Sequence, residues 1–153
     1  MKALEHRIPP PLVALILGVL MWLAARGAEF APIESDIRGV GSIVAMALGF
    51  ITSLAGALTF RRAGTTLNPH TIEKASTLVT NGIFALTRNP MYLGLTIILT
   101  GWAGWLGSPW LLVGPALCAL FLNRFQILPE ETVMREKFGA EYDAYCARVR
   151  RWL

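Results

Sequence analysis

The stretch LVTNGIFALTRNPMYLGL, Leu78–Leu95, joins a polar turn to the start of a long apolar run. Its first part carries the pair NG at 81–82 and the sequence TRNP at 87–90, which are residue types typical of turns. From there the chain has no charged residue over 89–123. A run of this length without charge is typical of segments that lie in lipid. An arginine, an asparagine and a tyrosine therefore stand at the edge of a predicted membrane segment.

The composition of the chain differs from that of a typical soluble protein. Its 153 residues are 54% hydrophobic and only 16% charged, with a mean hydropathy of +0.51. The uncharged runs cover residues 8–25, 39–60 and 89–123. Lipid is therefore the solvent that this composition predicts.

The lengths of the uncharged runs predict the number of spans. One span needs about 20 apolar residues at a rise of about 1.5 Å per residue. The first two runs fit one crossing each, whereas the third is too long for one and carries the turn-forming residues GSP at 107–109. We therefore predict a single all-α integral membrane domain over residues 1–153. Its four transmembrane helices are expected near 9–26, 39–60, 90–106 and 109–125, followed by an amphipathic C-terminal helical tail over 126–153.

Basic residues predict the orientation of the chain as a multi-pass protein, most simply in a bacterial inner membrane. With four spans both termini share a side, and that side carries twelve of the fourteen Lys and Arg residues. The opposite side has Arg26 and Arg38 beside three acidic residues. Because short cytoplasmic loops are enriched in Lys and Arg, we expect both termini, the loop over 61–89 and the tail in the cytoplasm. The first run is long and lacks a small-residue cleavage site, so we interpret it as a span and not as a signal peptide.

Several function classes are disfavoured by the sequence. The basic residues are interleaved with acidic ones, which gives no nucleic-acid surface. Cys118 lies in a predicted span and Cys146 in the cytoplasmic tail, so no disulfide is expected. His6 and His70 stand far apart with no paired ligand motif, so no metal site is predicted. A Gly-rich dinucleotide loop, a P-loop and a serine elbow are all missing from the sequence.

Small residues recur at every fourth position of the second predicted span: Gly41, Ala45, Gly49, Ser53 and Ala57. Such a ridge lets a second helix approach closely in lipid, where packing holds helices together. We interpret the ridge as a helix-packing face.

The tail LPEETVMREKFGAEYDAYCARVRRWL, from Leu128, has the pattern of two short helices. The first is predicted to begin at Pro129 with Glu130 and Glu131 in its first turn, and to end near the FG pair at 138–139. Its apolar stripe suits either the membrane surface or the end of the bundle. A favourable charge at a helix start is one sufficient explanation of the acidic pair.

Location gives the acidic pair a second interpretation. If the third and fourth spans form a hairpin with a short outer turn, their cytoplasmic ends lie side by side. This brings the polar turn close to the start of the tail. We use the term polar mouth for the resulting cluster of Arg88, Asn89, Tyr92, Arg124, Glu130 and Glu131.

The segments GTTLNP, LVTNGIFALTRNPMYLG and PEETVMREKFGAEYDAYCARVRRWL resemble the isoprenylcysteine carboxyl methyltransferase family and its wider relatives, the phospholipid methyltransferases, in a short bacterial form. The resemblance covers roughly residues 61–153. It implies an all-helical membrane enzyme that binds S-adenosylmethionine between the loop before the third span and the tail. Carried over by position, the implied cofactor-binding residues are Leu78, Val79, Gly82, Phe84, Arg88, Asn89, Pro90, Tyr92, Gly94, Glu130 and Glu131. Position 89 is Asn where many members have His.

The residue types also suit methyl transfer on chemical grounds. This reaction is an in-line displacement at a sulfonium carbon, so the protein mainly positions donor and nucleophile and excludes water. Arg88 suits the carboxylate of the cofactor through a charge-assisted contact. Glu131 and Arg135 are four residues apart, so on a helix they share a face and are expected to orient the cofactor amine and an acceptor carboxylate. We therefore predict Arg88, Glu131 and Arg135 as catalytic residues, with S-adenosylmethionine as cofactor and a lipophilic or prenylated carboxylate as acceptor.

Three alternatives stay open at this point. Phospholipid N-methylation would use a similar cofactor site with an amine acceptor. A membrane reductase of the sterol-reductase kind would bind NADPH, but the negative phosphates of that cofactor disfavour the adjacent pair Glu130 and Glu131. A non-catalytic assembly subunit would tolerate substitution of the polar mouth.

Overall fold

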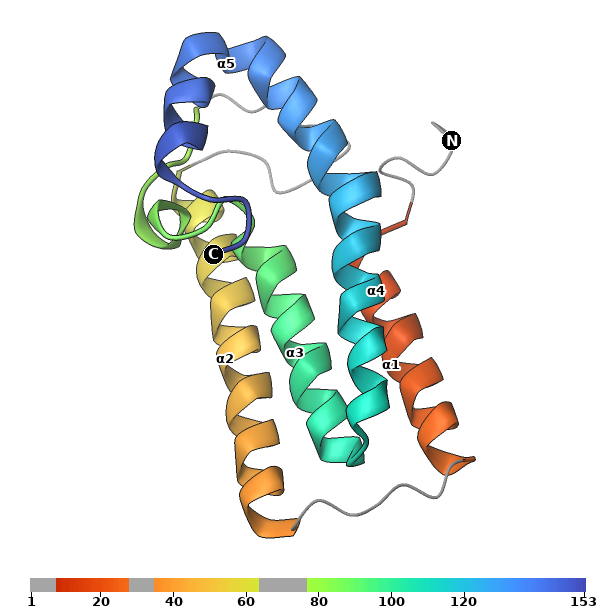
Figure 1. Cartoon of the computed structure of the whole chain (residues 1–153). Coiled ribbons are helices and arrows are strands. Elements are labelled where there is room, and N and C mark those ends of the chain that lie inside the picture. Colours follow the sequence, from red (N-terminus) through yellow and green to blue (C-terminus); the bar gives the residue numbers. More distant parts are fainter. Residues whose placement is uncertain (1–7, 28–34, 64–76) are drawn as a thin grey trace.

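The computed structural model describes residues 8–27, 35–63 and 77–153. Its long helices are α1 (Pro10–Arg26), α2 (Ser35–Arg62), α3 (Pro90–Leu106), α4 (Val113–Leu122) and α5 (Leu128–Arg148) (Figure 1). Short 3-10 helices cover Gly82–Ala85 and Pro109–Leu112, and a π-helix covers Asn123–Ile127. All secondary structure in the described ranges is helical, which confirms the predicted class. His6, His70 and much of the predicted loops lie outside these ranges.

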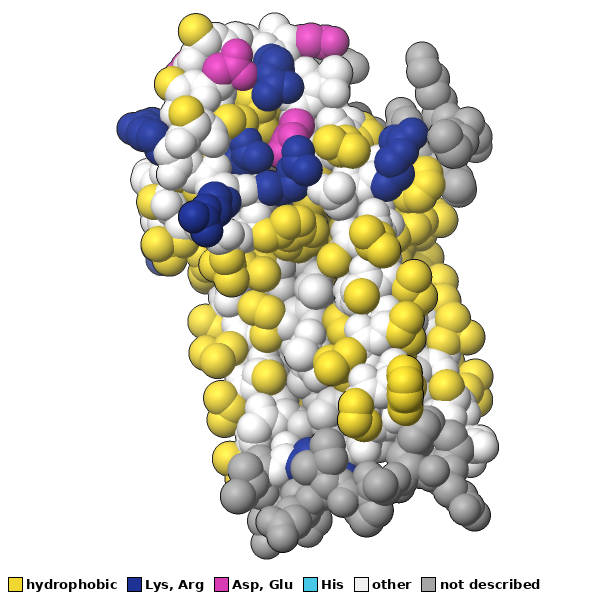
Figure 2. Space-filling view, viewed as in Figure 1, with side chains coloured by type: hydrophobic (Ala, Val, Ile, Leu, Met, Phe, Trp, Pro, Cys, Tyr) yellow, Lys and Arg dark blue, Asp and Glu magenta, His cyan; other side chains and the backbone are white. Residues whose placement is uncertain are grey.

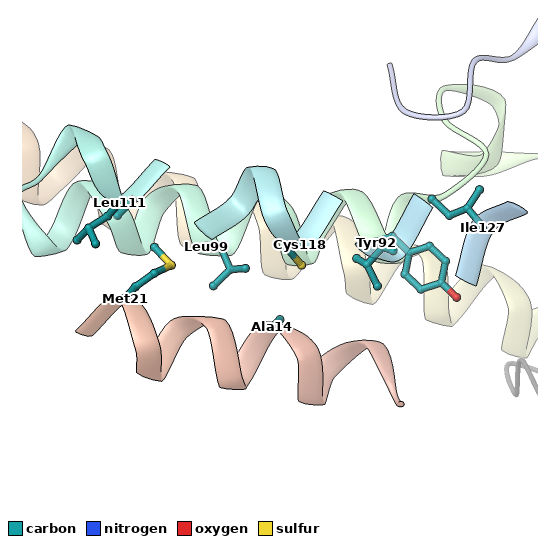
Figure 3. Packing of buried hydrophobic residues seen from close by; sticks show 9 residues of the cluster. Ala14, Met21, Tyr92, Leu99, Leu111, Cys118 and Ile127 are labelled. Carbon is teal, nitrogen blue, oxygen red and sulfur yellow. The ribbon is translucent and has the colours of Figure 1, made fainter. Parts of the chain in front are cut away.

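The helices α1 to α4 run alongside one another as a bundle, in which α3 packs against α1, α2 and α4 (Figure 1). The side chains of Met21, Leu99 and Cys118 meet in the core between α1, α3 and α4 (Figure 3). Tyr92 and Ile127 close the same core at the end that faces α5 (Figure 3). The apolar core therefore reaches directly to the predicted polar mouth.

The outer face of the bundle is apolar as well. Leu15 on α1, Phe50 on α2 and Leu120 on α4 are 63%, 61% and 66% exposed. Figure 2 shows hydrophobic side chains along the bundle, whereas most of the visible charged side chains gather at the end where α5 lies. Exposed apolar surface of this extent marks contact with a membrane or a partner. Together with the apolar composition, this surface indicates a bundle solvated by lipid.

Within the described ranges, two helices are long and apolar enough to cross a membrane, namely Arg38–Arg62 and the continuous helix over Pro109–Arg148. The other two apolar helices, α1 and α3, have 17 residues each. A helix of that length rises about 25 Å, at the lower limit for a span. The four-span arrangement therefore stays a prediction.

The helices α2 and α3 approach each other through small residues. A Cβ atom on Gly49 would stand 2.6 Å from the carbonyl oxygen of Gly94, so only glycine fits there. One turn further along, Ser53 donates its hydroxyl to the Met91 carbonyl at 3.0 Å. Gly41 has open space around it, so the predicted ridge makes contact along only part of its length.

The turn between α3 and α4 forms where the GSP sequence predicted it. Gly107 has a φ of 82°, in the left-handed region that favours glycine, and its N–H donates to the carbonyls of Ala103 and Gly104. Pro109 then starts the 3-10 helix that leads into α4. The predicted hairpin of the third and fourth apolar segments is confirmed.

The α-helix α5 begins at Leu128 with Pro129, Glu130 and Glu131 in its first turn, as predicted. The sequence did not predict that the chain continues from α4 through the π-helix into α5 without a break. A proline inside a helix lacks the N–H that its ordinary acceptor four residues earlier needs, and its ring clashes with that carbonyl. The residue four positions before Pro129 is Phe125, which lies in the π-helix Asn123–Ile127. The wider π turn thus accommodates the proline where we expected a new helix.

The second half of α5 folds back over the end of the bundle (Figure 1). The reversal occurs at Gly139, which has a φ of 49° and a ψ of −124° inside the helix, so the predicted break near 138–139 is confirmed. Beyond it, Tyr142 and Tyr145 pack with Leu78 in a second apolar cluster. The tail therefore covers the bundle end, one of its two predicted positions. We use the term C-terminal strap for residues 149–152, which follow α5.

Candidate functional site

Pro90 starts α3 and sets the geometry of the turn before it. A proline fits the first turn of a helix, where no N–H donor is needed. The residue before a proline avoids the helical region, and Asn89 has a φ of −132° and a ψ of 58°. Arg88 and Asn89 therefore stay outside the helix, at the polar end of the bundle.

The C-terminal strap binds this turn through its backbone. The N–H of Arg88 donates to the carbonyl of Arg150 at 3.0 Å. The hydroxyl of Thr87 and the side-chain amide of Asn89 both donate to the carbonyl of Arg151, at 3.3 and 2.9 Å. Because the acceptors are carbonyls, these contacts do not depend on the side chains of the strap.

Glu131 is the charged centre of the site and is only 8% exposed. Arg151 holds it in a bidentate pair, with Nε 2.9 Å from Oε1 and Nη2 2.7 Å from Oε2. Arg88 adds a third contact, from Nη2 to Oε1 at 3.1 Å. Arg151 also donates from Nη1 to Asn123 Oδ1 at 3.1 Å, which ties the cluster to the π-helix. A buried carboxylate is tolerated when it is paired and hydrogen-bonded in this way.

Glu130 has a different environment from its neighbour. Its carboxylate accepts a hydrogen bond from the hydroxyl of Tyr92. Burial raises the pKa of Glu130 from the ordinary value of 4.5 to about 7, while the Tyr92 hydrogen bond acts to lower it and the charge of Glu131 raises it. The two adjacent carboxyls thus have different partners: two arginines bind Glu131 and one tyrosine binds Glu130.

One hydrogen-bond donor of Arg88 is not used by any described residue. Its Nε is buried and has no hydrogen-bond partner among the described residues, although Nη2 contacts Glu131. Buried polar groups are nearly always paired, so an unpaired guanidinium N–H marks a place for a ligand acceptor. A carboxylate is the acceptor that a guanidinium binds best.

Comparison with known proteins assigns most of the chain to a family. A family model described as phospholipid methyltransferase matches residues 37–141, more than half of the chain. The chain belongs to the phospholipid methyltransferase family. An uncharacterized protein of Haemophilus influenzae (strain ATCC 51907 / DSM 11121 / KW20 / Rd) is 48% identical over 63 residues, which are 41% of this chain and the whole of that protein. No solved structure matches the chain.

Membership of the phospholipid methyltransferase family makes this chain a membrane methyltransferase with a lipid-related substrate class. The match includes α2, α3, the π-helix and the first part of α5, and so contains Arg88, Tyr92, Glu130 and Glu131. The C-terminal strap lies beyond the matched residues. The pairing of Glu131 with Arg151 is therefore a feature of this structure that the match does not cover.

Arg135 does not contact Glu131, although the two residues were expected to act together at the site. Arg135 binds Asp143 instead, with Nε 2.8 Å from Oδ1, and both side chains are more than half exposed. The cause is the reversal at Gly139, which turns the second half of α5 back so that Asp143 meets Arg135. Glu131 is instead engaged by Arg88 and Arg151. The catalytic role of Arg135 stays a prediction.

The other predicted cofactor residues lie either at the turn before α3 or at the contact between α2 and α3. Leu78, Val79 and Phe84 are buried next to the turn, and Phe84 accepts a 2.7 Å hydrogen bond at its carbonyl from Tyr145. Gly82 has a φ of 58°, as a turn glycine needs. Gly94 faces α2 at the close helix contact, so its position is explained by packing and not by the site.

Two residues of the site were missed by sequence reasoning, namely Arg151 and Asn123. Asn123 was interpreted as the end of an uncharged run, and Arg151 as part of a basic terminus. The V-x-R-W sequence at the terminus is a signal that contains Arg151, but it gives no partner for it. Only the folding back of α5 brings this arginine to Glu131.

Proposed function

We propose that this protein is an S-adenosylmethionine-dependent methyltransferase whose cofactor binds at the polar mouth and whose acceptor arrives through the membrane. The observation that carries the proposal is the buried Glu131 held by two arginines, where the apolar core meets the charged end of the bundle. Family membership supplies the reaction class. Ionisable side chains at the edge of a membrane segment are rare and usually mark a functional site.

The residues present fit S-adenosylmethionine. The free Nε of Arg88 suits the carboxylate of the cofactor. Gly82, in a left-handed conformation, leaves the backbone of the turn accessible to a ligand. When bound, S-adenosylmethionine supplies a methyl group on a positively charged sulfur. The chain itself has to orient the two reactants and exclude water.

The acceptor that fits best is an amine of a phospholipid headgroup. The sequence resemblance favoured a carboxylate acceptor, and that stays a prediction. Two observations support the amine instead: the description of the family, and a buried carboxyl, Glu130, whose pKa of about 7 suits proton transfer near neutrality. A carboxylate acceptor carries no proton that must be removed, so it gives Glu130 no such task.

The proton balance of the amine reaction is simple. Glu130 takes a proton from the ammonium of the headgroup, which frees the nitrogen lone pair. The nitrogen then forms a bond to the methyl carbon while the carbon–sulfur bond breaks, and that electron pair remains on sulfur. Tyr92 holds the carboxyl in place through its hydroxyl, and the proton leaves later to the cytoplasmic water.

The proposed membrane placement follows from the surface of the bundle. The four apolar segments cross the bilayer, with α1 and α3 as the shorter spans, and both termini lie in the cytoplasm. The exposed apolar side chains of Leu15, Phe50 and Leu120 then contact lipid. The headgroup of a neighbouring lipid would lie at the level of the polar mouth.

The experiment uses the purified full-length protein in detergent, without added metal. Binding of S-adenosylhomocysteine is measured by calorimetry and compared with that of NADPH. We expect binding of the sulfur compound, and tighter binding of NADPH would support the reductase alternative and overturn the proposal. Labelled S-adenosylmethionine is then added with vesicles of phosphatidylethanolamine or with a prenylated cysteine. Label in the vesicle lipid supports the amine, and label in the prenylated cysteine supports the carboxylate.

A further inference from the structure

Two arginines bind Glu131, but they do so with different numbers of hydrogen-bond donors. Arg151 engages both oxygens of the carboxylate, at 2.9 and 2.7 Å. Arg88 makes a single longer contact, 3.1 Å from Nη2 to Oε1, and its buried Nε has no partner among the described residues. The proposed function uses that free Nε for the cofactor.

We infer that Arg151 is a positioning residue that occupies Glu131 so that Arg88 remains available to the cofactor. A guanidinium and a carboxylate have matching planar forks and pair most strongly through two parallel bonds. Without Arg151, Glu131 would be free to turn and form such a pair with Nε and Nη2 of Arg88. The inference rests on the proposed function and adds to it a residue outside the segment that matches the family.

The position of Arg151 does not depend on its own side chain. The strap is fixed to the turn by three hydrogen bonds that end on the carbonyls of Arg150 and Arg151. Val149 is buried in the second apolar cluster, and Trp152 packs against the main core. Shortening the side chain of Arg151 therefore removes the guanidinium and leaves the strap in place. This separates an effect on the site from an effect on the fold.

The alternative is that Arg151 only stabilises the end of the chain. Its side chain is 32% exposed, and partly exposed ion pairs contribute little because water screens them. In that case loss of the guanidinium would lower the melting temperature slightly and leave cofactor affinity unchanged. A positioning role therefore predicts a change in cofactor affinity, whereas a purely stabilising role predicts a change in melting temperature alone.

The test compares Arg151→Gln with the wild type in the full-length protein in detergent. Calorimetry measures the Kd for S-adenosylhomocysteine, and steady-state rates with labelled S-adenosylmethionine give KM and kcat. We expect Kd and KM to rise at least about tenfold, while kcat at saturating donor changes by less than about threefold. Arg151→Lys keeps a positive charge but lacks the planar guanidinium. Its Kd and KM should lie between those of the wild type and those of Arg151→Gln. Arg148→Gln removes an exposed charge from the last turn of α5 and should match the wild type.

A double-mutant cycle shows whether Arg151 acts through Glu131. In a Glu131→Gln background there is no carboxylate to restrain, so adding Arg151→Gln should change Kd by less than about twofold. An equal loss of affinity in both backgrounds would overturn the inference, as would an unchanged Kd in Arg151→Gln alone. If the wild type itself fails to bind S-adenosylhomocysteine, the proposed function is overturned together with the inference.

Discussion

Arg151 and Glu131 form a bidentate ion pair across twenty residues of chain, with contacts of 2.9 and 2.7 Å. The pair joins the C-terminal strap to α5, and its third member, Arg88, joins both to the start of α3. Three segments that are separate in sequence thus meet on one carboxylate.

Substitution Glu131→Gln should cut methyl transfer by about a hundredfold or more. The neutral amide cannot hold two guanidinium groups, so Arg88 and Arg151 lose their common anchor and the site loses its order. Each tenfold change in rate corresponds to about 1.4 kcal/mol of barrier, so a hundredfold loss is well within the effect of a site residue.

The matched control is Glu136→Gln, which removes the same charge from an exposed position on the same helix. Rates are measured at saturating cofactor. Similar, near-normal rates for the two variants would show that Glu131 has no part in the reaction.

Substitution Tyr92→Phe should move the pH dependence of methyl transfer to higher pH. Glu130 acts as a base only when it is ionised, so the wild-type rate should rise with pH through about 7, where burial has set the pKa of Glu130. The Tyr92 hydrogen bond lowers that pKa, so its removal raises the midpoint of the profile. The measurement is kcat/KM against pH.

Tyr145→Phe serves as the control for this shift. It also removes a hydroxyl that donates a hydrogen bond, in this case to the carbonyl of Phe84 at 2.7 Å. It should lower stability and leave the midpoint in place. A midpoint that is the same in Tyr92→Phe and the wild type would contradict proton transfer to Glu130.

Substitution Glu130→Gln should change how stability depends on pH. The pKa of Glu130 is raised by burial from 4.5 to about 7 in the folded protein, so the folded state holds the proton more tightly than the unfolded state. Between those two values the wild type should lose stability as pH rises.

Glu130→Gln has no proton to lose, so its melting temperature should fall less over this interval than that of the wild type. Thermal melts in detergent between pH 4.5 and pH 8 measure the difference. Glu141→Gln, at an exposed position of α5, should keep the wild-type slope. Parallel slopes for Glu130→Gln and the wild type would mean that Glu130 is not a strained buried carboxyl.

Substitution Gly94→Ala should destabilise the bundle strongly. The added Cβ would collide with the Ser53 hydroxyl and with the carbonyl oxygen of Gly49, and neither backbone can move without separating α2 from α3. We expect a loss of several degrees in melting temperature. Gly41→Ala on α2 has open space around it and should be neutral or slightly stabilising, since alanine favours helix over glycine by about 0.5–1 kcal/mol.

Reporter fusions should place both termini on the cytoplasmic side. A reporter after Leu153 and one inserted into the connection between α1 and α2, within residues 29–37, are expected to give opposite topology signals. That connection lies mostly outside the described residues, so the prediction depends on the charge distribution alone. Matching signals would mean that the predicted number of spans is wrong.

The sequence by itself determined the helical class, the apolar segments and the turns between them. Charge-free runs can be recognised without knowledge of their neighbours, because lipid requires helices whose backbone groups bond internally. The turn at 107–109 and the break near Gly139 could also be predicted from the local sequence, because glycine accepts backbone conformations that other residues avoid. Arg88, Tyr92, Glu130 and Glu131 were brought to one place by the hairpin alone.

Only the tertiary structure decided which of these groups bind one another. The spacing of Glu131 and Arg135 placed them on one helix face, yet the reversal at Gly139 brings Asp143 to Arg135. The same reversal carried Arg151 back to Glu131 from the far end of the chain. Partners that are distant in sequence depend on the direction in which a helix leaves a kink, and no local pattern of residues encodes that direction.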